Sequence, residues 1–323
     1  MNELDEPTIS IAVPLFNEAL GIEVFHNQLL NELSKIEKYQ FEIIYCDDGS
    51  TDNTTEIIKK LELKKYNIKL IQFSRNFGKE IALTACINEA RGNAVITLDG
   101  DGQHPQHLIA DFINSWEKGA KVVIGVRKNN MSEGISKKLG SWIFYKSINN
   151  LTGQKLVVGS TDFRLIDRSV QKEFIKLTEP NRITRALIDW LGFKRHYIYF
   201  DAVERIHGSP GYSTKKLIKL AVDSFVSISP RPLYLFGYLG VGISFISFIT
   251  GLIVIIEQLI LGDPLNWSFT GTAMLGILII FLVGIVLMSQ GILSVYTSML
   301  NIQSKQRPLY IIDYDESIGL KVE

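Results

Sequence analysis

Residues 94–105 read AVITLDGDGQHP, an apolar run that stops at two aspartates. The run Ala94–Leu98 predicts a buried strand, and Asp99-Gly100-Asp101 predicts a turn that leaves two carboxylates beyond its carboxyl end. Carboxylate oxygens favour Mg²⁺ or Mn²⁺, which bridge to phosphates and neutralise charge on a departing diphosphate. Taken alone, the pattern fits solvated turn acids at least as well, because Asp and Gly are favoured in turns for conformational reasons.

His104 and His107 follow these acids and raise the alternative of a zinc site. No cysteine lies beside them and Pro105 predicts a helix start, so we interpret both histidines as surface or helix-cap residues. The two cysteines of the chain, Cys46 and Cys86, are far apart and form no CxxC pair. This spacing favours reduced thiols in a cytosolic compartment over a disulfide.

Four further β-rich runs alternate with amphipathic helical stretches in the first 125 residues. The runs are Ile9–Val13, Phe41–Cys46, Lys69–Phe73 and Lys121–Ile124. Strands that alternate with helices predict a mainly parallel α/β sheet, in which ligands bind beyond the carboxyl ends of the strands. Those ends read PLFNE at residues 14–18, DDGS at 47–50 and DGD at 99–101. The acidic and turn residues therefore gather where a ligand site belongs.

The DDGS and RNFGK motifs each leave two interpretations open. Ser50 or Thr51 can cap the next helix, but capping leaves Asp47 free at the strand end, where it can hold a uracil N–H or a ribose hydroxyl. RNFGK at residues 75–79 begins another helix. Lys79 adds a cation to a helix N-terminus that already favours phosphate, although a solvated lysine is the simpler alternative.

The composition indicates more apolar surface than a soluble protein of this size needs. Hydrophobic residues make up 46% of the 323 residues, and the mean hydropathy is positive. The 34 basic and 34 acidic residues cancel, so the overall charge gives no argument for a nucleic-acid partner. The first residues lack an apolar core, so we expect no cleavable signal peptide.

Two long uncharged stretches predict a transmembrane helical hairpin. Residues 233–256 carry no charge, and a helix of that length reaches roughly 36 Å, enough for a hydrocarbon core of about 30 Å. The spans lie at about 233–257 and 268–298, on either side of a break at 262–266. Lys and Arg flank the hairpin and are absent from its loop, which predicts cytoplasmic termini at the inner or plasma membrane. A buried helix pair is the alternative, but such helices normally keep a polar face.

These patterns divide the chain into four parts. Residues 1–213 form the expected cytosolic catalytic domain, 214–232 a juxtamembrane amphipathic helix, 233–300 the membrane helices and 301–323 a cytosolic C-terminal tail. Residues 136–151, like the juxtamembrane stretch, repeat apolar residues at helical spacing beside lysines. That pattern predicts helices in the lipid headgroup layer, with packing on the domain core as the alternative.

Five motifs stand in an order that carries a resemblance to a known family. They are PLFNE at 14–18, DDGS at 47–50, RNFGK at 75–79, DGDGQHP at 99–105 and TDFRL at 161–165. On these motifs the chain resembles the family 2 glycosyltransferases, which have the Rossmann-like GT-A fold. Within that family it looks like the polyprenyl-phosphate branch of dolichyl-phosphate mannose synthases and bactoprenol glucosyltransferases, whose two C-terminal membrane helices it shares.

The resemblance implies a role for each matching residue. Asp99, Asp101 and Gln103 would surround the metal, and Asp162 would lie near the reacting sugar with Arg164 either ordering it or contacting the acceptor. The full nucleotide-sugar set comprises Pro14, Phe16, Glu18, Asp47, Asp48, Lys79, Asp99, Gly100, Asp101, Gln103, Arg127 and Arg205, of which Lys79, Arg127 and Arg205 would meet phosphates. Arg205, Ser213 and Lys215 would hold the acceptor phosphate. The stretch GSPGYSTKK at 208–216 departs from the Gly-x-Ser-Lys-Tyr-like family pattern, so the choice among Ser213, Lys215 and Lys216 stays open.

The resemblance also implies an activity. We expect inverting transfer of glucose from UDP-glucose to undecaprenyl phosphate or another polyprenyl phosphate on the cytosolic face of the membrane, with Mg²⁺ or Mn²⁺ as cofactor. A homo-oligomer is left open. A processive polysaccharide synthase is one alternative, although the chain has few predicted spans and no Gln-x-x-Arg-Trp motif. The other alternative is a non-catalytic membrane protein that binds nucleotide-sugars.

Overall fold

The computed structural model describes residues 8–61, 67–128, 157, 159–180, 182–201, 245, 249, 256 and 271–320. The chain divides into two compact units. The first comprises Met1–Lys215 together with Arg307–Glu323, and the second comprises Lys216–Gln306. Within the second unit, the described part is mainly α10 (Gly271–Ser304).

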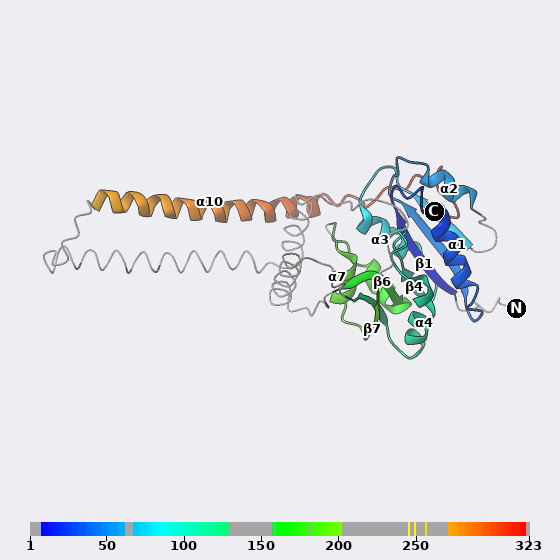
Figure 1. The fold of residues 1–323 in the computed structure, drawn as a ribbon. Helices are drawn as coiled ribbons and strands as arrows, with labels where there is room; N and C mark the ends of the chain where they lie inside the picture. The colour runs from blue at the N-terminus through cyan, green and yellow to red at the C-terminus, as the bar shows by residue number, and fades with distance from the viewer. Residues whose placement is uncertain are drawn as a thin grey trace. The chain divides into compact units, whose positions relative to one another are not determined.

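A mostly parallel sheet forms the centre of the first unit (Figure 1). In the described residues its strand order is β3-β2-β1-β4-β6-β5-β7. The strands are β1 (Thr8–Leu15), β2 (Gln40–Asp47), β3 (Asn67–Gln72), β4 (Ala94–Thr97), β5 (Val122–Arg127), β6 (Ser160–Asp167) and β7 (Arg195–Phe200). Of the strands that the structure describes, only β6 runs antiparallel to its neighbours, β4 and β5. The predicted α/β sheet and its five predicted strands are confirmed, whereas β6 and β7 are additions that the sequence patterns did not indicate.

Helices cover both faces of this sheet, because successive strand side chains point to opposite faces. On β1, Ile11 and Val13 pack into one apolar cluster and Ala12 into the other. The first cluster is completed by α1 (Ile22–Leu33), α2 (Thr54–Lys60) and α4 (Ile109–Glu117). The second is completed by α3 (Lys79–Glu89), α6 (Arg168–Ile175) and α7 (Thr184–Trp190). A 3₁₀ turn, η1 (Gln106–Leu108), precedes α4.

One ion pair lies inside this apolar framework. Glu42 on β2 and Lys69 on β3 are both almost fully buried, and their charged atoms lie 3.0 Å apart. Glu42 also accepts hydrogen bonds from the Ser10 hydroxyl and from the backbone N–H groups of Arg91 and Gly92. Burial alone would raise the pKa of Glu42, but these hydrogen bonds and the charge of Lys69 lower it below its usual value.

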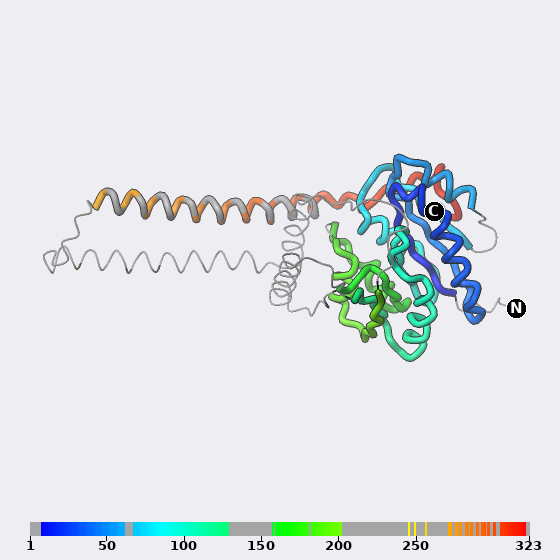
Figure 2. The backbone as a smooth tube through the Cα atoms, in the orientation of Figure 1, coloured from blue at the N-terminus to red at the C-terminus, as the bar shows by residue number. Residues whose placement is uncertain are grey.

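The C-terminal segment Leu309–Leu320 returns to the sheet and lies along β3 (Figure 2). Backbone bridges join Leu70 to Ile318 and Phe73 to Ile312, both antiparallel. The segment therefore covers an edge strand that would otherwise present unpaired backbone groups.

The described residues do not support the predicted localisation. None of their helices is long and apolar enough to cross a bilayer, and this finding contradicts the predicted inner-membrane localisation. That prediction rested on the length of uncharged sequence, much of which lies outside the described residues. The first predicted span falls outside them apart from residues 245, 249 and 256, as do the loop 262–266 and the amphipathic segments 136–151 and 214–232.

We predict that Lys69→Met destabilises the fold by about 3 kcal/mol, because it leaves the Glu42 carboxylate buried without its counter-charge. Urea unfolding at neutral pH measures the loss. Since the pKa of Glu42 is lowered in the folded state, the lost stability is present above the unfolded pKa and disappears as pH falls through the folded one. The difference from wild type should therefore shrink in acid.

Lys35→Met serves as the matched control. Lys35 pairs with Glu32 on the surface of α1 with more than half of its side chain exposed, so its loss should change stability little. Equal destabilisation by the two variants would contradict the assignment of a special role to the buried pair.

Candidate active site

The antiparallel pairing of β6 with β4 brings two distant motifs together. Thr97 at the end of β4 pairs with Arg164 on β6, and its hydroxyl donates to the backbone carbonyl of Asp162. The amino end of β6 thus lies beside the carboxyl end of β4, from which Asp99 follows. This strand pairing is what places Asp162 at the edge of the sheet where ligands bind in such folds.

Lys79 lies between these two carboxylates. It is the first residue of α3, and its Nζ lies 2.7 Å from Asp99 Oδ1 and 3.0 Å from Asp162 Oδ2. Burial would lower the pKa of Lys79, but attraction to both carboxylates outweighs it and raises that pKa. Conversely, burial would raise the pKa of Asp162, but the charges of Lys79 and then Arg185 lower it well below its usual range. Asp162 is therefore ionised at neutral pH.

The second oxygen of Asp162 lacks such a partner. Oδ1 is buried and has no hydrogen-bond partner among the described residues, and only 13% of the side chain is exposed. A buried carboxylate oxygen without a donor is costly unless a ligand supplies one. This oxygen is thus suited to face a substrate group.

Arg164 is held inside the domain rather than at its surface. Its side chain is 1% exposed, its Nη1 lies 2.9 Å from Asp189 Oδ1 on α7, and its Nε donates to the Thr161 carbonyl at 3.0 Å. Of the two roles left open for Arg164, the geometry favours ordering of Asp162 through the backbone of Thr161.

The DGD turn is built on a buried histidine. His104 is 4% exposed, its ring stacks on Phe163 at 5.3 Å, and its Nδ1 accepts from the Asp99 backbone N–H. Burial lowers the pKa of His104, so the ring is neutral with its proton on Nε2. The expectation that His104 is a surface residue is wrong, because a neutral imidazole can pack inside a core when its nitrogens are satisfied. His107 is exposed, as expected.

The same turn joins three of the predicted site residues. The Gln103 N–H donates to Asp101 Oδ1 at 3.0 Å, and Gln103 Oε1 accepts from Arg127 Nη2 at 2.9 Å. Gly100 allows the turn to approach β1, since a Cβ at this position would lie 2.2 Å from Leu15 Cδ2. Asp101, Gln103 and Arg127 are therefore linked by hydrogen bonds. Arg127 Nε is buried and has no hydrogen-bond partner among the described residues.

Asp47 and Asp48 brace loops in this structure. Asp47 is fully buried and accepts from the Ser50 N–H at 3.0 Å, the Ser50 hydroxyl at 2.5 Å and the Thr55 hydroxyl. Asp48 accepts from the N–H groups of Phe77 at 2.7 Å and Gly78 at 2.9 Å. The expectation that Asp47 is free at the strand end is wrong, because hydroxyls three and eight residues later reach back to it.

Ser50 and Thr51 also differ from the expected helix caps. The N-cap of α2 is Asn53, without a side-chain capping bond. Ser50 Oγ instead accepts from the Asn17 N–H at 2.9 Å, and the Thr51 N–H donates to Asn17 Oδ1 at 2.8 Å. These bonds tie the DDGS loop to the PLFNE loop that follows β1.

Gly49 allows the RNFGK loop to join the DDGS and PLFNE loops. Its φ is +68°, and a Cβ at this position would lie 2.7 Å from the carbonyl carbon of Arg75. Only glycine permits both the left-handed conformation and that approach. The RNFGK loop consequently packs against the DDGS loop, which places Lys79 next to the DGD turn.

The remaining residues predicted to bind the nucleotide-sugar differ in their solvent exposure. Phe16 is 43% exposed just beyond β1, whereas Pro14 is buried within that strand. Glu18 is half-buried, and its backbone N–H donates to Thr54 Oγ1 at 2.9 Å. Arg205, Ser213 and Lys215 lie outside the described residues.

Two site residues, Glu80 and Arg185, carried no sequence signal. Glu80 is half-buried and accepts from the Thr184 N–H at 2.7 Å; desolvation and the nearby Asp162 charge raise its pKa. Arg185 on α7 is close enough for its charge to lower the pKa of Asp162. Both are charged residues on helices with no distinctive motif around them. Their place in the site therefore becomes visible only from their tertiary contacts.

The comparisons with known proteins establish the family of this chain. The family described as glycosyl transferase family 2 matches residues 10–174. The chain belongs to this family and is a glycosyltransferase.

Among its relatives, it is 35% identical over 312 residues to the uncharacterized glycosyltransferase YkcC of Bacillus subtilis (strain 168), covering 97% of this chain and 94% of that protein. It is also 35% identical over 305 residues to the bactoprenol glucosyl transferase of Shigella phage SfV, covering 94% and 97%. Among solved structures, it is similar to mannosyl-3-phosphoglycerate synthase from Rubrobacter xylanophilus, with a TM-score of 0.49 and 16% identity over 72% of this chain and 75% of that one.

Enzymes with the GT-A fold commonly use a divalent cation, and the residues of this site fit one. In the described part of the chain no three His, Cys, Asp or Glu side chains could hold a metal by themselves. Mg²⁺ usually binds one or two carboxylates and completes its shell with water and substrate phosphates, so the carboxylates of Asp99 and Asp101 meet that need. Asp99 already attracts a cationic group, the Lys79 ammonium.

We predict that Lys79→Met strengthens binding of Mn²⁺ to the donor-free protein about tenfold, because an ammonium no longer competes for Asp99 and Asp162. A tenfold change corresponds to about 1.4 kcal/mol. Titration calorimetry with Mn²⁺ alone measures it.

Lys176→Met is the control, since Lys176 pairs with Glu173 on the surface of the same domain. Unchanged or weaker Mn²⁺ binding in Lys79→Met would show that Lys79 does not compete with a metal at these carboxylates.

Proposed function

We propose that the enzyme transfers glucose from UDP-glucose to the phosphate of a polyprenyl phosphate such as undecaprenyl phosphate, with inversion at the anomeric carbon. The observation that carries the proposal is the convergence of Asp99, Lys79 and an ionised Asp162 at one edge of the sheet. The bactoprenol glucosyl transferases among the relatives support a polyprenyl phosphate acceptor, through the activity in their names and the nearly full-length match.

The donor would lie across the three loops that these contacts tie together. The exposed ring of Phe16 offers an apolar face for a base, and Glu18 lies two residues further along the same loop. Arg127, whose Nε has no hydrogen-bond partner in the described part of the chain, and Lys79 supply positive charge for the diphosphate. The metal, when bound by Asp99 and Asp101 near Gln103, would supply further positive charge to the leaving diphosphate.

Asp162 could act either as a general base or as a group that positions the sugar, and its ionisation state supports the second role. A carboxylate whose pKa is held below its usual range is a weak proton acceptor at neutral pH. A phosphate acceptor is already anionic and has little need of a base. We therefore assign Asp162 to positioning the sugar and stabilising positive charge at the anomeric carbon, while the acceptor oxygen attacks and the bond to the diphosphate breaks.

Arg164 and Arg185 would support that role from two sides. Arg164 holds the Thr161 carbonyl and is itself fixed by Asp189, so it acts on Asp162 as a positioning residue. Arg185 acts through its charge. Arg205, Ser213 and Lys215 remain the proposed contacts of the acceptor phosphate, by the family resemblance alone.

We predict that Asp162→Asn lowers the turnover number about a hundredfold and leaves the dissociation constant of the nucleotide-sugar nearly unchanged. A hundredfold corresponds to about 2.7 kcal/mol of transition-state stabilisation. Asparagine keeps the shape and removes the charge that acts mainly in the transition state. Turnover and donor affinity are measured on the same purified variant.

The control for this variant is Asp111→Asn, an exposed aspartate on α4. If Asp162 merely braced its loop, melting temperature and donor affinity would fall together in Asp162→Asn. Weakened donor binding with unchanged turnover would refute the assignment.

A second prediction concerns the metal. Asp99→Ala and Asp101→Ala should each abolish transfer while the protein stays folded, because the diphosphate then leaves without its counter-charge. Circular dichroism checks the fold, and EDTA treatment followed by Mg²⁺ or Mn²⁺ addition checks the wild type. Near-normal turnover in the presence of EDTA would contradict the proposal that transfer requires a divalent metal.

The substrates are identified by a matrix of donors and acceptors. UDP-glucose, UDP-N-acetylglucosamine and GDP-mannose are each incubated with undecaprenyl phosphate, and the lipid product is quantified by mass spectrometry. We expect the highest kcat/KM with UDP-glucose, and a clear preference for another donor would replace that part of the proposal.

A further inference from the structure

The C-terminal segment Leu309–Leu320 contacts the sheet at the strand that leads into the donor loops. Gln72, the last residue of β3, donates its N–H to Ser317 Oγ at 3.0 Å, and its carbonyl accepts from the Asp313 N–H at 2.8 Å. The next residues continue this contact, since the Ser74 N–H donates to the Ile311 carbonyl at 3.1 Å. The segment thus fixes the backbone immediately before Arg75 and the RNFGK loop.

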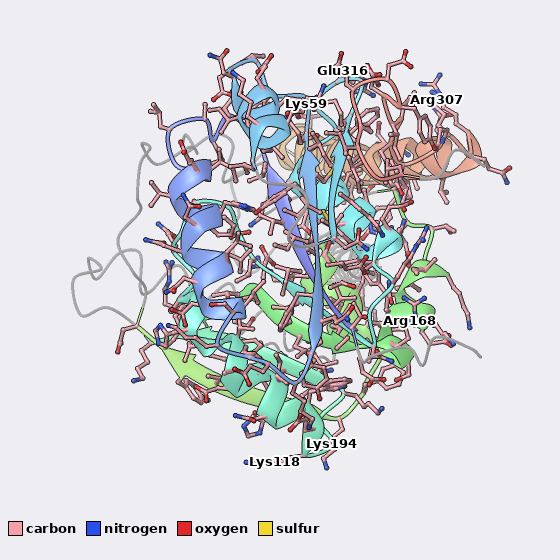
Figure 3. The ribbon with its side chains drawn as sticks, turned by 90° about the vertical axis from the view of Figure 1, so that its right-hand side faces the viewer. Lys59, Lys118, Arg168, Lys194, Arg307 and Glu316 are labelled. Atoms are coloured by element: carbon pink, nitrogen blue, oxygen red, sulfur yellow. The ribbon has the colours of Figure 1, made fainter. Side chains whose placement is uncertain are left out.

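A second anchor is aromatic. Tyr310 stacks on Phe73 with ring centroids 5.1 Å apart, and its hydroxyl accepts from Asn88 Nδ2 at 3.2 Å. Burial is the main cause that raises the pKa of Tyr310. An ion pair between Glu316 of the segment and Lys59 of α2 provides a further contact. Both residues are labelled at the same end of the domain in Figure 3.

From Gln72 the contacts lead to Asp47. Thr55 Oγ1 lies 3.0 Å from the side-chain amide of Gln72 and donates to the Asp47 carboxylate. The Phe73 N–H donates to the Asp47 carbonyl at 3.0 Å. Both the side chain and the backbone of Asp47 therefore depend on residues that the C-terminal segment holds.

From Phe73 the contacts lead to Asp48. The ring of Phe73 meets Phe77 edge-on at 5.5 Å, and the Phe77 N–H donates to Asp48 at 2.7 Å. Phe73 is thus packed between Tyr310 and Phe77. Two independent routes, one polar and one aromatic, join the segment to the loops that precede Lys79.

We propose that the C-terminal segment Leu309–Leu320 is a positioning element of the donor site, with Tyr310 and Ser317 as its positioning residues. Among the residues that the structure describes, it contacts none of the predicted substrate-binding side chains. It acts by holding the DDGS and RNFGK loops in the geometry that binds the nucleoside diphosphate. The inference rests on the proposed nucleotide-sugar donor. A segment that only covered the edge of β3 would affect stability without a specific effect on donor affinity.

The test compares Tyr310→Ala with Tyr39→Ala. Tyr39 also packs its ring against an aromatic residue, Trp116 at 6.0 Å, and bonds through its hydroxyl to Glu117, and neither partner belongs to a donor loop. Titration calorimetry with UDP and with UDP-glucose gives the dissociation constants, and thermal unfolding gives the melting temperatures. Steady-state kinetics separate the donor KM from kcat.

Tyr310→Ala should raise the dissociation constant of UDP about tenfold and raise the donor KM in step, with kcat at saturating donor changed less than threefold. Tyr310→Phe, which keeps the ring, should stay within threefold of wild type. Tyr39→Ala should lower the melting temperature but keep the dissociation constant within twofold. A UDP dissociation constant within twofold of wild type in Tyr310→Ala would overturn the proposal.

Ser317→Ala keeps the inference testable if Tyr310→Ala does not fold. It removes a single acceptor for the Gln72 N–H and should raise the UDP dissociation constant about threefold, whereas an unchanged value would count against the proposal. Failure of the wild-type enzyme to bind UDP, while it binds another nucleotide, would instead refute the proposed donor. The variants would then be titrated with that nucleotide.

Discussion

The arrangement of this enzyme depends on one electrostatic constraint, the placement of two carboxylates against a single ammonium group. Asp99 and Asp162 come from different motifs and would repel each other if they met alone. Lys79 lies within 3.0 Å of both and offsets that repulsion. Because Lys79 can occupy this place only at the start of α3, the loop before it must be fixed, and Asp48 and Gly49 fix it. Much of the polar structure at this edge of the sheet follows from that requirement.

The short helix α7 connects the parts that carry these charges. Asp189 on α7 pairs with Arg164 of β6, and the N–H of Thr184 at its start donates to Glu80 of α3. The strand that carries Asp162 and the helix that carries Lys79 are therefore tied to the same element. Removal of one partner of the Arg164–Asp189 pair would leave a buried charge without its counter-charge, which is more damaging than loss of an exposed pair. The backbone positions of Lys79 and Asp162 are in this way held by contacts to α7, although the Lys79 side chain itself is 42% exposed.

The sequence predicted the elements whose signal is local. Strands buried on both faces show continuous apolar runs, and all five such runs became strands. β6 was not predicted because it begins with site residues and buries an arginine, and β7 because it is a half-exposed edge strand. The hydroxyl partners of Asp47 lie close in sequence, yet the sequence pattern favours a helix cap for Ser50 and gives no signal for Thr55. The contact between Arg164 and Asp189 depends on how a strand and a helix pack, so no local pattern indicates it. The motif resemblance predicted the family and the activity, whereas the ionisation state of Asp162 required the structure.

The order in which ribosomes make this chain gives the C-terminal segment a further significance. Gln72 and Ser317, which bond to each other, are separated by 245 residues. At a synthesis rate of about 5–20 residues per second, the C-terminal segment is made roughly 12 to 50 seconds after β3, and the edge of β3 stays uncovered until then. During that time the nascent domain exposes backbone groups that can pair with another chain. A message truncated near its end would thus yield a protein that has every proposed metal ligand but retains an open, aggregation-prone edge.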